Sequence, residues 1–182
     1  MDIVVREAVP RDEKFVLELN RENVEVLSPM DSAKYEYFRR VSEMFRVIEA
    51  DGEPVAFLIA LREGIPDYRS ENYIWFSKQY EKFLYVDRIV IAEKARHLGI
   101  GRRLYEEVFS QAADSGVDTV TAEIDIIPYN GPSLKFHEAM GFEEVGRQSI
   151  RGGAIEVSLE ARKILPQGIQ DGDMRIQRGP VT

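Results

Sequence analysis

The sequence predicts an α/β domain, in which the strands of a central sheet and amphipathic helices follow one another along the chain. Residues 84–91 form an apolar run that only Asp87 and Arg88 interrupt, which is typical of a buried strand. Residues 55–61 are apolar at every position, as expected for a central strand covered on both faces. From residue 100 to 112, apolar side chains recur every third or fourth position and indicate an amphipathic helix.

A short loop with two glycines joins the strand at 84–91 to this helix. It reads Arg96-His97-Leu98-Gly99-Ile100-Gly101-Arg102. The first turn of a helix has backbone N–H groups without intrahelical partners and carries partial positive charge. Glycines let a phosphate approach the backbone, and basic side chains concentrate here in an acidic chain. We therefore expect an anion-binding loop; the alternative is a strand–helix turn whose glycines serve packing.

The remaining elements follow from local signals. A strand at 3–8 precedes a helix that begins at Pro10, and Asp31 can cap a second helix. The strands 44–50 and 55–61 are joined by a hairpin signal, Asp51-Gly52-Glu53-Pro54. Later strands are expected at 118–127, 143–150 and 154–165, with a short helix at 130–140 that Gly141 closes. Residues 166–182 lack a core pattern, so we expect one domain over 1–165 and a tail that could dock on a partner subunit in a homodimer.

Composition excludes several classes of function. The net charge of −8 argues against nonspecific nucleic-acid binding and mildly favours cationic substrates. The chain has no cysteine and two histidines, which excludes disulfides, thiolate metal sites and a multi-histidine zinc site, so we expect no metal. The N-terminus is too charged for a signal peptide and no apolar run suits a membrane span. We expect a cytoplasmic protein without nucleic-acid or membrane partners.

Two motifs together resemble the GNAT family of N-acetyltransferases. Residues 96–101 match its acetyl-CoA signature, R/Q-x-x-G-x-G/A, after a strand. Residues 130–142, NGPSLKFHEAMGF, are similar to the family's N-x-x-A-x-x-[LF]-[YH]-E-x-x-G-F stretch. The resemblance covers about residues 83–142. It implies a GNAT fold: a mixed, mostly antiparallel sheet of about seven strands, splayed between strands four and five and flanked by helices.

The resemblance also implies which residues bind acetyl-CoA. The signature loop would hold the pyrophosphate, the strand before it would meet the pantetheine arm through its backbone, and the helix at 130–140 would border that arm. The implied cofactor-binding residues are Ile89, Val90, Ile91, Arg96, His97, Leu98, Gly99, Ile100, Gly101, Arg102, Asn130, Ser133 and Phe136. The backbone N–H of Ile89 is the expected donor to the thioester oxygen.

Residues 63–82 form an aromatic-rich insertion relative to the family, whose members usually cross between these strands in a few residues. It carries five aromatic residues, including the only tryptophan. Long loops within compact domains are usually functional lids or interface elements. One interpretation is an aromatic lid that stabilises a cationic amine by cation–π contact. The other is a helix packed on the sheet, or a dimer contact.

Carboxylates near the expected splay are candidate general bases. Asp87 lies in the apolar run of the fourth strand, where a strand carboxylate beside the acetyl site is a family pattern. Its alternative role is an ion pair with Arg88 or a hydrogen bond to a loop. Glu123 and Asp125 share one face of the fifth strand, and for them a solvated face is the competing interpretation.

The general acid is expected at His137, where many relatives carry tyrosine. An imidazole can donate to the leaving thiolate, whose pKa is about 8.5. Equally, His137 could only pack against the cofactor, and Tyr129 and Tyr85 are substitute acids. The implied function is acetyl-CoA-dependent acetylation of a primary amine on a small cationic molecule. The alternatives are an acyl-CoA sensor without turnover and an acetyltransferase of a protein or peptide amine.

Overall fold

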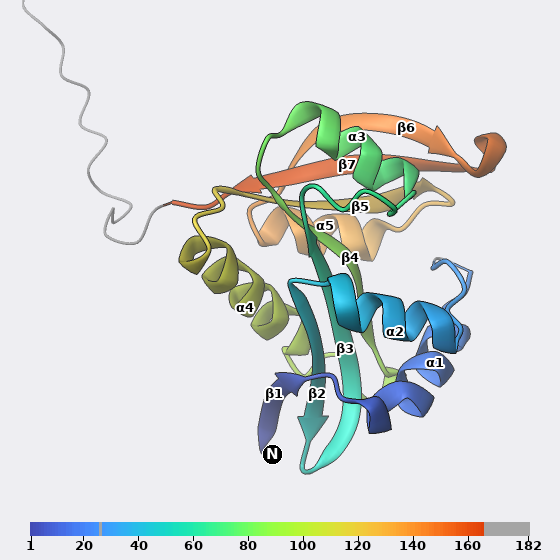
Figure 1. The fold of residues 1–182 in the computed structure, drawn as a ribbon, viewed down its shortest axis with the longest axis vertical. Helices are drawn as coiled ribbons and strands as arrows, with labels where there is room; N and C mark the ends of the chain where they lie inside the picture. The colour runs from blue at the N-terminus through green and yellow to red at the C-terminus, as the bar shows by residue number, and fades with distance from the viewer. Residues whose placement is uncertain (26, 166–182) are drawn as a thin grey trace, which may run out of the picture.

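A computed structural model describes residues 1–25 and 27–165 and shows one seven-stranded sheet flanked by helices (Figure 1). The strand order is β1-β2-β3-β4-β5-β7-β6. All neighbours are antiparallel except β4 and β5, which are parallel. The strands are β1 (Ile3–Glu7), β2 (Met44–Ala50), β3 (Glu53–Arg62), β4 (Leu84–Ile91), β5 (Thr119–Ile127), β6 (Glu143–Ile150) and β7 (Ile155–Lys163). The predicted mixed sheet is confirmed; the tail at 166–182 lies outside the described residues.

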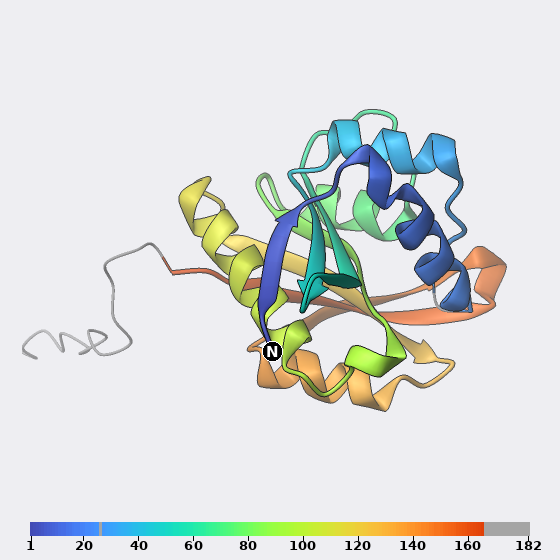
Figure 2. The ribbon, with the colours of Figure 1, turned by 90° about the horizontal axis from the view of Figure 1, so that it is seen from below.

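Within the described residues, five α-helices cover the two faces of this sheet (Figure 2). They are α1 (Glu13–Glu22), α2 (Ser32–Val41), α3 (Glu71–Gln79), α4 (Ile100–Asp114) and α5 (Gly131–Ala139). One core lies between the sheet and α4 with α5, where Leu104, Val108 and Phe142 are buried. The other lies against α1, α2 and α3, where Phe38 and Phe76 are buried. The sheet is therefore covered on both faces, as the fully apolar β3 requires.

Local sequence signals explain the helix ends. The side chain of Asp31 caps α2 by accepting a hydrogen bond from the backbone N–H of Lys34 over 2.8 Å, as predicted. Asn130 caps α5 in the same way through Ser133. Gly141 follows α5 with a φ of 82°, the left-handed conformation that favours glycine at a helix C-terminus. These caps set where the helices that border the sheet begin and end.

The inserted segment 63–82 contains α3, so the packed helix is the alternative that the structure adopts. Tyr73 and Phe76 on its inner face are buried in the core against the sheet. Trp75 lies on Gly146 of β6: a Cβ at this glycine would lie 2.5 Å from Cζ2 of the indole. The tryptophan therefore packs α3 against the edge strand β6. This packing places the start of α3 close to β5.

The sheet opens between β4 and β5, as the resemblance implied. The two strands pair at Leu84–Val120 and Tyr85–Thr121, and no further pair joins them within the part of the chain that the structure describes. On its other side β4 stays paired with β3 as far as Ile91, with a register shift that leaves Asp87 as the extra residue of a bulge. Bulges bend a strand and are common beside active sites. The bend turns β4 away from β5 at the point where the apolar run is interrupted.

Candidate active site

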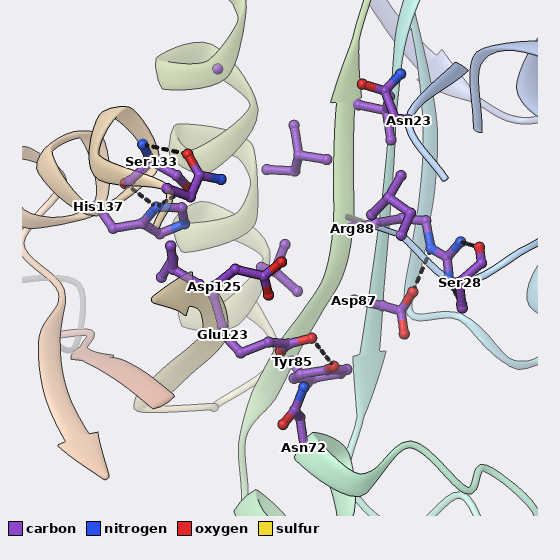
Figure 3. A pocket seen from close by; sticks show the side chains of 18 of the residues that line it. Asn23, Ser28, Asn72, Tyr85, Asp87, Arg88, Glu123, Asp125, Ser133 and His137 are labelled. Carbon is purple, nitrogen blue, oxygen red and sulfur yellow. Dashed lines mark hydrogen bonds and ion pairs between the residues drawn. The ribbon is translucent and has the colours of Figure 1, made fainter. Parts of the chain in front are cut away.

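A cavity of about 1100 Å³ occupies the opening between β4 and β5 and reaches both faces of the sheet (Figure 3). Its walls come from β4, β5, the loop before α4, the start of α5, the α1–α2 connection and the segment that leads into α3. All the predicted site residues line it except one, namely Asp87, Ile89, Val90, Ile91, Arg96, His97, Gly99, Ile100, Gly101, Arg102, Asn130, Ser133, Phe136 and His137. The exception is Leu98, which is 41% exposed and does not line the cavity.

The glycine loop at the start of α4 forms one end of the cavity. Gly99 precedes the helix with a φ of 74°, in the left-handed region that glycine adopts without strain. Gly101 is needed for space, because a Cβ there would lie 3.2 Å from Cζ of Phe136 and 3.6 Å from Cδ1 of Ile91. Arg96, His97 and Arg102 are exposed around the loop. A helix N-terminus, a glycine cradle and basic side chains together suit a phosphate group.

His137 faces the cavity from α5 but uses both ring nitrogens within the protein. Its Nδ1 donates to the carbonyl of Ser133 over 2.8 Å, which fixes the tautomer, because a carbonyl only accepts. Its Nε2 therefore accepts from the hydroxyl of Tyr105 over 2.7 Å. Burial lowers the pKa of the imidazole, so the ring is neutral near pH 7. This geometry favours a packing role; His137 as proton donor stays a prediction.

Asp87 at the bulge of β4 is engaged in a buried ion pair. Its Oδ2 lies 2.6 Å from Nε of Arg88, and the two side chains are only 4% and 3% exposed. The hydroxyl of Tyr68, from the inserted segment, donates to the other carboxylate oxygen. The pairing with Arg88 is thus one of the two alternatives expected from the sequence, and both oxygens of Asp87 have partners.

Arg88 joins this ion pair to the connection between α1 and α2. Its guanidinium donates to Oδ1 of Asn20 over 2.8 Å and to Oγ of Ser28 over 3.0 Å. Asn20 itself is buried and donates to the backbone carbonyl of Ser28. Helix α1 and the connection that follows it are therefore tied to β4, and Asn23 and Ser28 line the wall of the cavity (Figure 3).

Glu123 projects from β5 into the opening, opposite Tyr85 of β4 (Figure 3). The hydroxyl of Tyr85 donates to its Oε1 over 2.9 Å. Its Oε2 is shielded from solvent and has no hydrogen-bond partner among the described residues. Burial, with the nearby charge of Asp87, raises the pKa of this carboxyl to about 8. The solvated face considered for Glu123 is therefore wrong.

Three further candidates occupy different environments. Asp125, two residues along β5, is half-buried, its Oδ2 lacks a partner among the described residues, and burial raises its pKa. Tyr85 is buried at 1% exposure, and burial raises its pKa well above the usual value. Tyr129, the other substitute acid, is 76% exposed and does not line the cavity.

The sequence of residues 13–142 matches the Acetyltransferase (GNAT) family. The chain belongs to this family. No curated protein matches it. As a GNAT member it is an N-acetyltransferase with acetyl-CoA as the acetyl donor.

Solved acetyltransferase structures share its fold at low sequence identity. Ard1 from Thermoplasma volcanium superposes with a TM-score of 0.74 at 16% identity, covering 91% of this chain and 99% of that one. The ribosomal-protein-S18-alanine N-acetyltransferase from Escherichia coli gives 0.67 at 14% identity, covering 93% and 99%. Naa20 from Chaetomium thermophilum, solved with a bisubstrate analogue, gives 0.72 at 19% identity, covering 88% and 86%. These likenesses establish the fold and leave the acceptor of this acetyltransferase open.

Within residues 1–25 and 27–165, no group of three or more histidine, aspartate or glutamate side chains could hold a metal ion. In the same part of the chain, no helix is both long and apolar enough to cross a membrane.

Sequence reasoning named Glu123 but ranked it below Asp87, and it missed Asn72 and Arg88 as parts of the site. The alternation along β5 correctly placed Glu123 and Asp125 on one face. It could not show that this face is covered by the inserted helix, whose Asn72 lines the same cavity. An arginine within an apolar strand was the available signal for a buried network at Arg88.

Proposed function

We propose that this acetyltransferase transfers the acetyl group of acetyl-CoA to a primary amine of a small cationic molecule, with Glu123 as the general base. The observation that carries the proposal is the free, solvent-shielded Oε2 of Glu123 in the opening of the sheet. A general base works best when its pKa lies near the working pH, and that of Glu123 is about 8. Asp87, by contrast, has both oxygens engaged.

The acetyl-CoA side of the cavity is proposed at α4 and α5. The glycine cradle at Gly101 and the first turn of α4 would hold the pyrophosphate, with Arg96 and Arg102 adding charge-assisted contacts. Residues 89–91 of β4 lack a strand partner on the β5 side, so their backbone groups are available to the pantetheine arm. The N–H of Ile89 is the proposed donor to the thioester oxygen.

The acceptor side is proposed between β5, the α1–α2 connection and the segment that leads into α3. A free alkyl ammonium has a pKa of about 10.4 and must lose a proton before its nitrogen can attack. In the proposed step, Glu123 takes one proton from the ammonium, and the neutral nitrogen forms a bond to the thioester carbon. The carbon–sulfur bond then breaks, CoA leaves as the thiolate, and the thiolate takes the second proton that the nitrogen releases. The carboxylates of Asp67, Glu71 and Asp125 line the same side and favour a cationic acceptor.

The proposal is tested by release of free CoA from acetyl-CoA with a panel of amines. The panel contains alkyl diamines, amino acids and peptides with free N-termini. We expect turnover with a small cationic amine, and Glu123→Gln should lower kcat by about 10²–10⁴-fold. Glu143→Gln, which changes an exposed carboxylate on β6, is the matched control and should leave kcat unchanged.

Three results would contradict parts of the proposal. Binding of acetyl-CoA without CoA release for any amine would indicate a sensor. Turnover confined to peptides would replace the small-molecule acceptor by a polypeptide amine. A kcat of Glu123→Gln within a few-fold of wild type would remove Glu123 as the base.

A further inference from the structure

Asn72, in the first turn of α3, lies buried beside the carboxylate of Glu123 (Figure 3). The residue is only 4% exposed. Its Oδ1 accepts a hydrogen bond from Nε2 of Gln148 on β6 over 2.6 Å. An amide whose oxygen is engaged on one side presents its NH₂ group on the other. On that side, the amide nitrogen of Asn72 points toward the carboxylate of Glu123 and the hydroxyl of Tyr85 (Figure 3).

We propose that Asn72, oriented by Gln148, is a positioning residue that holds the Glu123 carboxylate in the opening of the sheet. The inference rests on the proposed role of Glu123 as the base. It gives the inserted segment 63–82 a function, because that segment contributes a polar group to the acceptor site from outside both sequence motifs. It also connects the edge strand β6 to the reacting centre.

The docking of α3 fixes this arrangement. Trp75 lies on the backbone of Gly146, and Asn72 bonds Gln148, so two successive contacts join the same helix to the same strand. Helix residues three apart lie on one face, and strand residues two apart do as well. The two contacts therefore support each other and leave the amide of Asn72 little freedom to turn away from Glu123.

The charges around Glu123 explain why an oriented amide matters. The groups that face this region are Tyr85, Asp87 and Arg88 on β4, Tyr68 before α3, Asp125 on β5 and Tyr105 on α4. Asp87 and Asp125 oppose ionisation of Glu123, while the hydroxyl of Tyr85, which donates to it, and the nearby amide of Asn72 favour the charged form. Arg88 is already paired with Asp87. Loss of the Asn72 donor should therefore raise the pKa of Glu123.

The test reads the ionisation of Glu123 directly in the free protein. Carbon-13 carboxyl resonances are titrated in wild type, Asn72→Leu and Gln148→Leu, with the Glu123 signal assigned from Glu123→Gln. We expect Asn72→Leu to raise the pKa of Glu123 by about one unit, the usual size for losing a hydrogen bond to a charged group. Gln148→Leu should produce a smaller shift in the same direction, because Asn72 is then free to turn. The rising limb of kcat/KM against pH should move with the titration.

Tyr73→Phe is the matched control on the same helix. It removes the hydroxyl that donates to the carbonyl of Arg62 over 2.6 Å, and it does not touch Glu123. It should lower Tm without changing the pKa of Glu123. If Asn72→Leu does not fold, Gln148→Leu carries the test, because its side chain is only half-buried.

The outcomes separate the two proposals. An unchanged pKa of Glu123 in Asn72→Leu and Gln148→Leu, or an equal shift in Tyr73→Phe, would overturn the positioning role. Failure of the base role would instead be seen as normal turnover in Glu123→Gln. If the pKa of Glu123 shifts in Asn72→Leu but the pH dependence of kcat/KM does not, a role of Asn72 in catalysis is overturned.

Discussion

The hydroxyl of Tyr105 on α4 donates to Nε2 of His137 on α5 over 2.7 Å, and this bond joins the two helices that border the acetyl-CoA side of the cavity. The other ring nitrogen of His137 donates to the carbonyl of Ser133. Both partners are buried or half-buried, so the imidazole has no free position from which to donate to a leaving thiolate.

His137→Ala should therefore act mainly on stability. It leaves the buried hydroxyl of Tyr105 without its partner, which costs about 1–3 kcal/mol. We expect a clearly lower free energy of unfolding, measured in urea, with kcat within a few-fold of wild type. A fall in kcat of about 10²-fold or more, with unchanged acetyl-CoA affinity, would instead establish His137 as the general acid.

Gly101→Glu should abolish acetyl-CoA binding. The first side-chain carbon would crowd Phe136 at 3.2 Å, and the carboxylate would repel phosphate at the helix N-terminus. Isothermal titration calorimetry should show binding by wild type and none by the variant. Ser110→Glu adds the same charge at an exposed position of α4 and should bind normally. Normal affinity of Gly101→Glu would refute the phosphate loop.

Arg96→Ala should weaken acetyl-CoA without slowing the chemical step. A charge-assisted contact to the pyrophosphate contributes about 1.5–3 kcal/mol. The KM for acetyl-CoA should therefore rise by about tenfold or more while kcat changes little. Steady-state kinetics with saturating amine separates the two constants, and an effect on kcat alone would contradict the role.

Glu123 should make the protein less stable as pH rises. Its pKa is raised from 4.5 to about 8 in the fold, so the native state keeps a proton that the unfolded state releases. The associated stabilisation is complete below pH 4.5 and is lost as pH rises through 8. Glu123→Gln cannot ionise, and relative to it wild type should lose on the order of 5 kcal/mol across this window. Parallel urea curves for the two proteins would count against a buried, neutral Glu123.

Asp87→Asn should destabilise the protein by removing one partner of a buried ion pair. Arg88 would remain buried without its carboxylate, which typically costs about 3–5 kcal/mol. Adding Arg88→Met should recover much of that loss. Asp67→Asn, at an exposed carboxylate that accepts from Tyr37, is the control and should change stability by about 0.5 kcal/mol or less. A stable Asp87→Asn with low kcat would return Asp87 to the catalytic residues.

The fold was largely predictable because its signals are local. The apolar run at β4, the alternation along β5 and the cap at Asp31 each depend on residues close in sequence. The two family motifs, at residues 96–101 and 130–142, then predicted that the site lies at the opening of the sheet. Leu98, assigned to cofactor binding from its motif position, does not line the cavity, and its role in binding stays a prediction.

The chemistry of the site was less predictable because it depends on distant contacts. Glu123 is half-buried, with its Oε2 shielded from solvent by elements that the alternation of β5 cannot reveal. Its neighbour Asn72 hydrogen-bonds Gln148, 76 residues away in the chain. The bulge at Asp87 depends on the register between β3 and β4. Whether a strand carboxylate is paired, solvated or free is decided by such tertiary packing.

The short ladder between β4 and β5 has a consequence for the lifetime of the protein. Two residue pairs join β4 to β5, and with them the two halves of the sheet. A ligand bound between β4 and β5 therefore contacts both strands where they do not pair with each other. A ligand that binds only the folded state adds about 2.7 kcal/mol of stability at one hundred times its Kd. The concentration of acetyl-CoA would then govern how often the sheet parts and how fast proteases remove the chain.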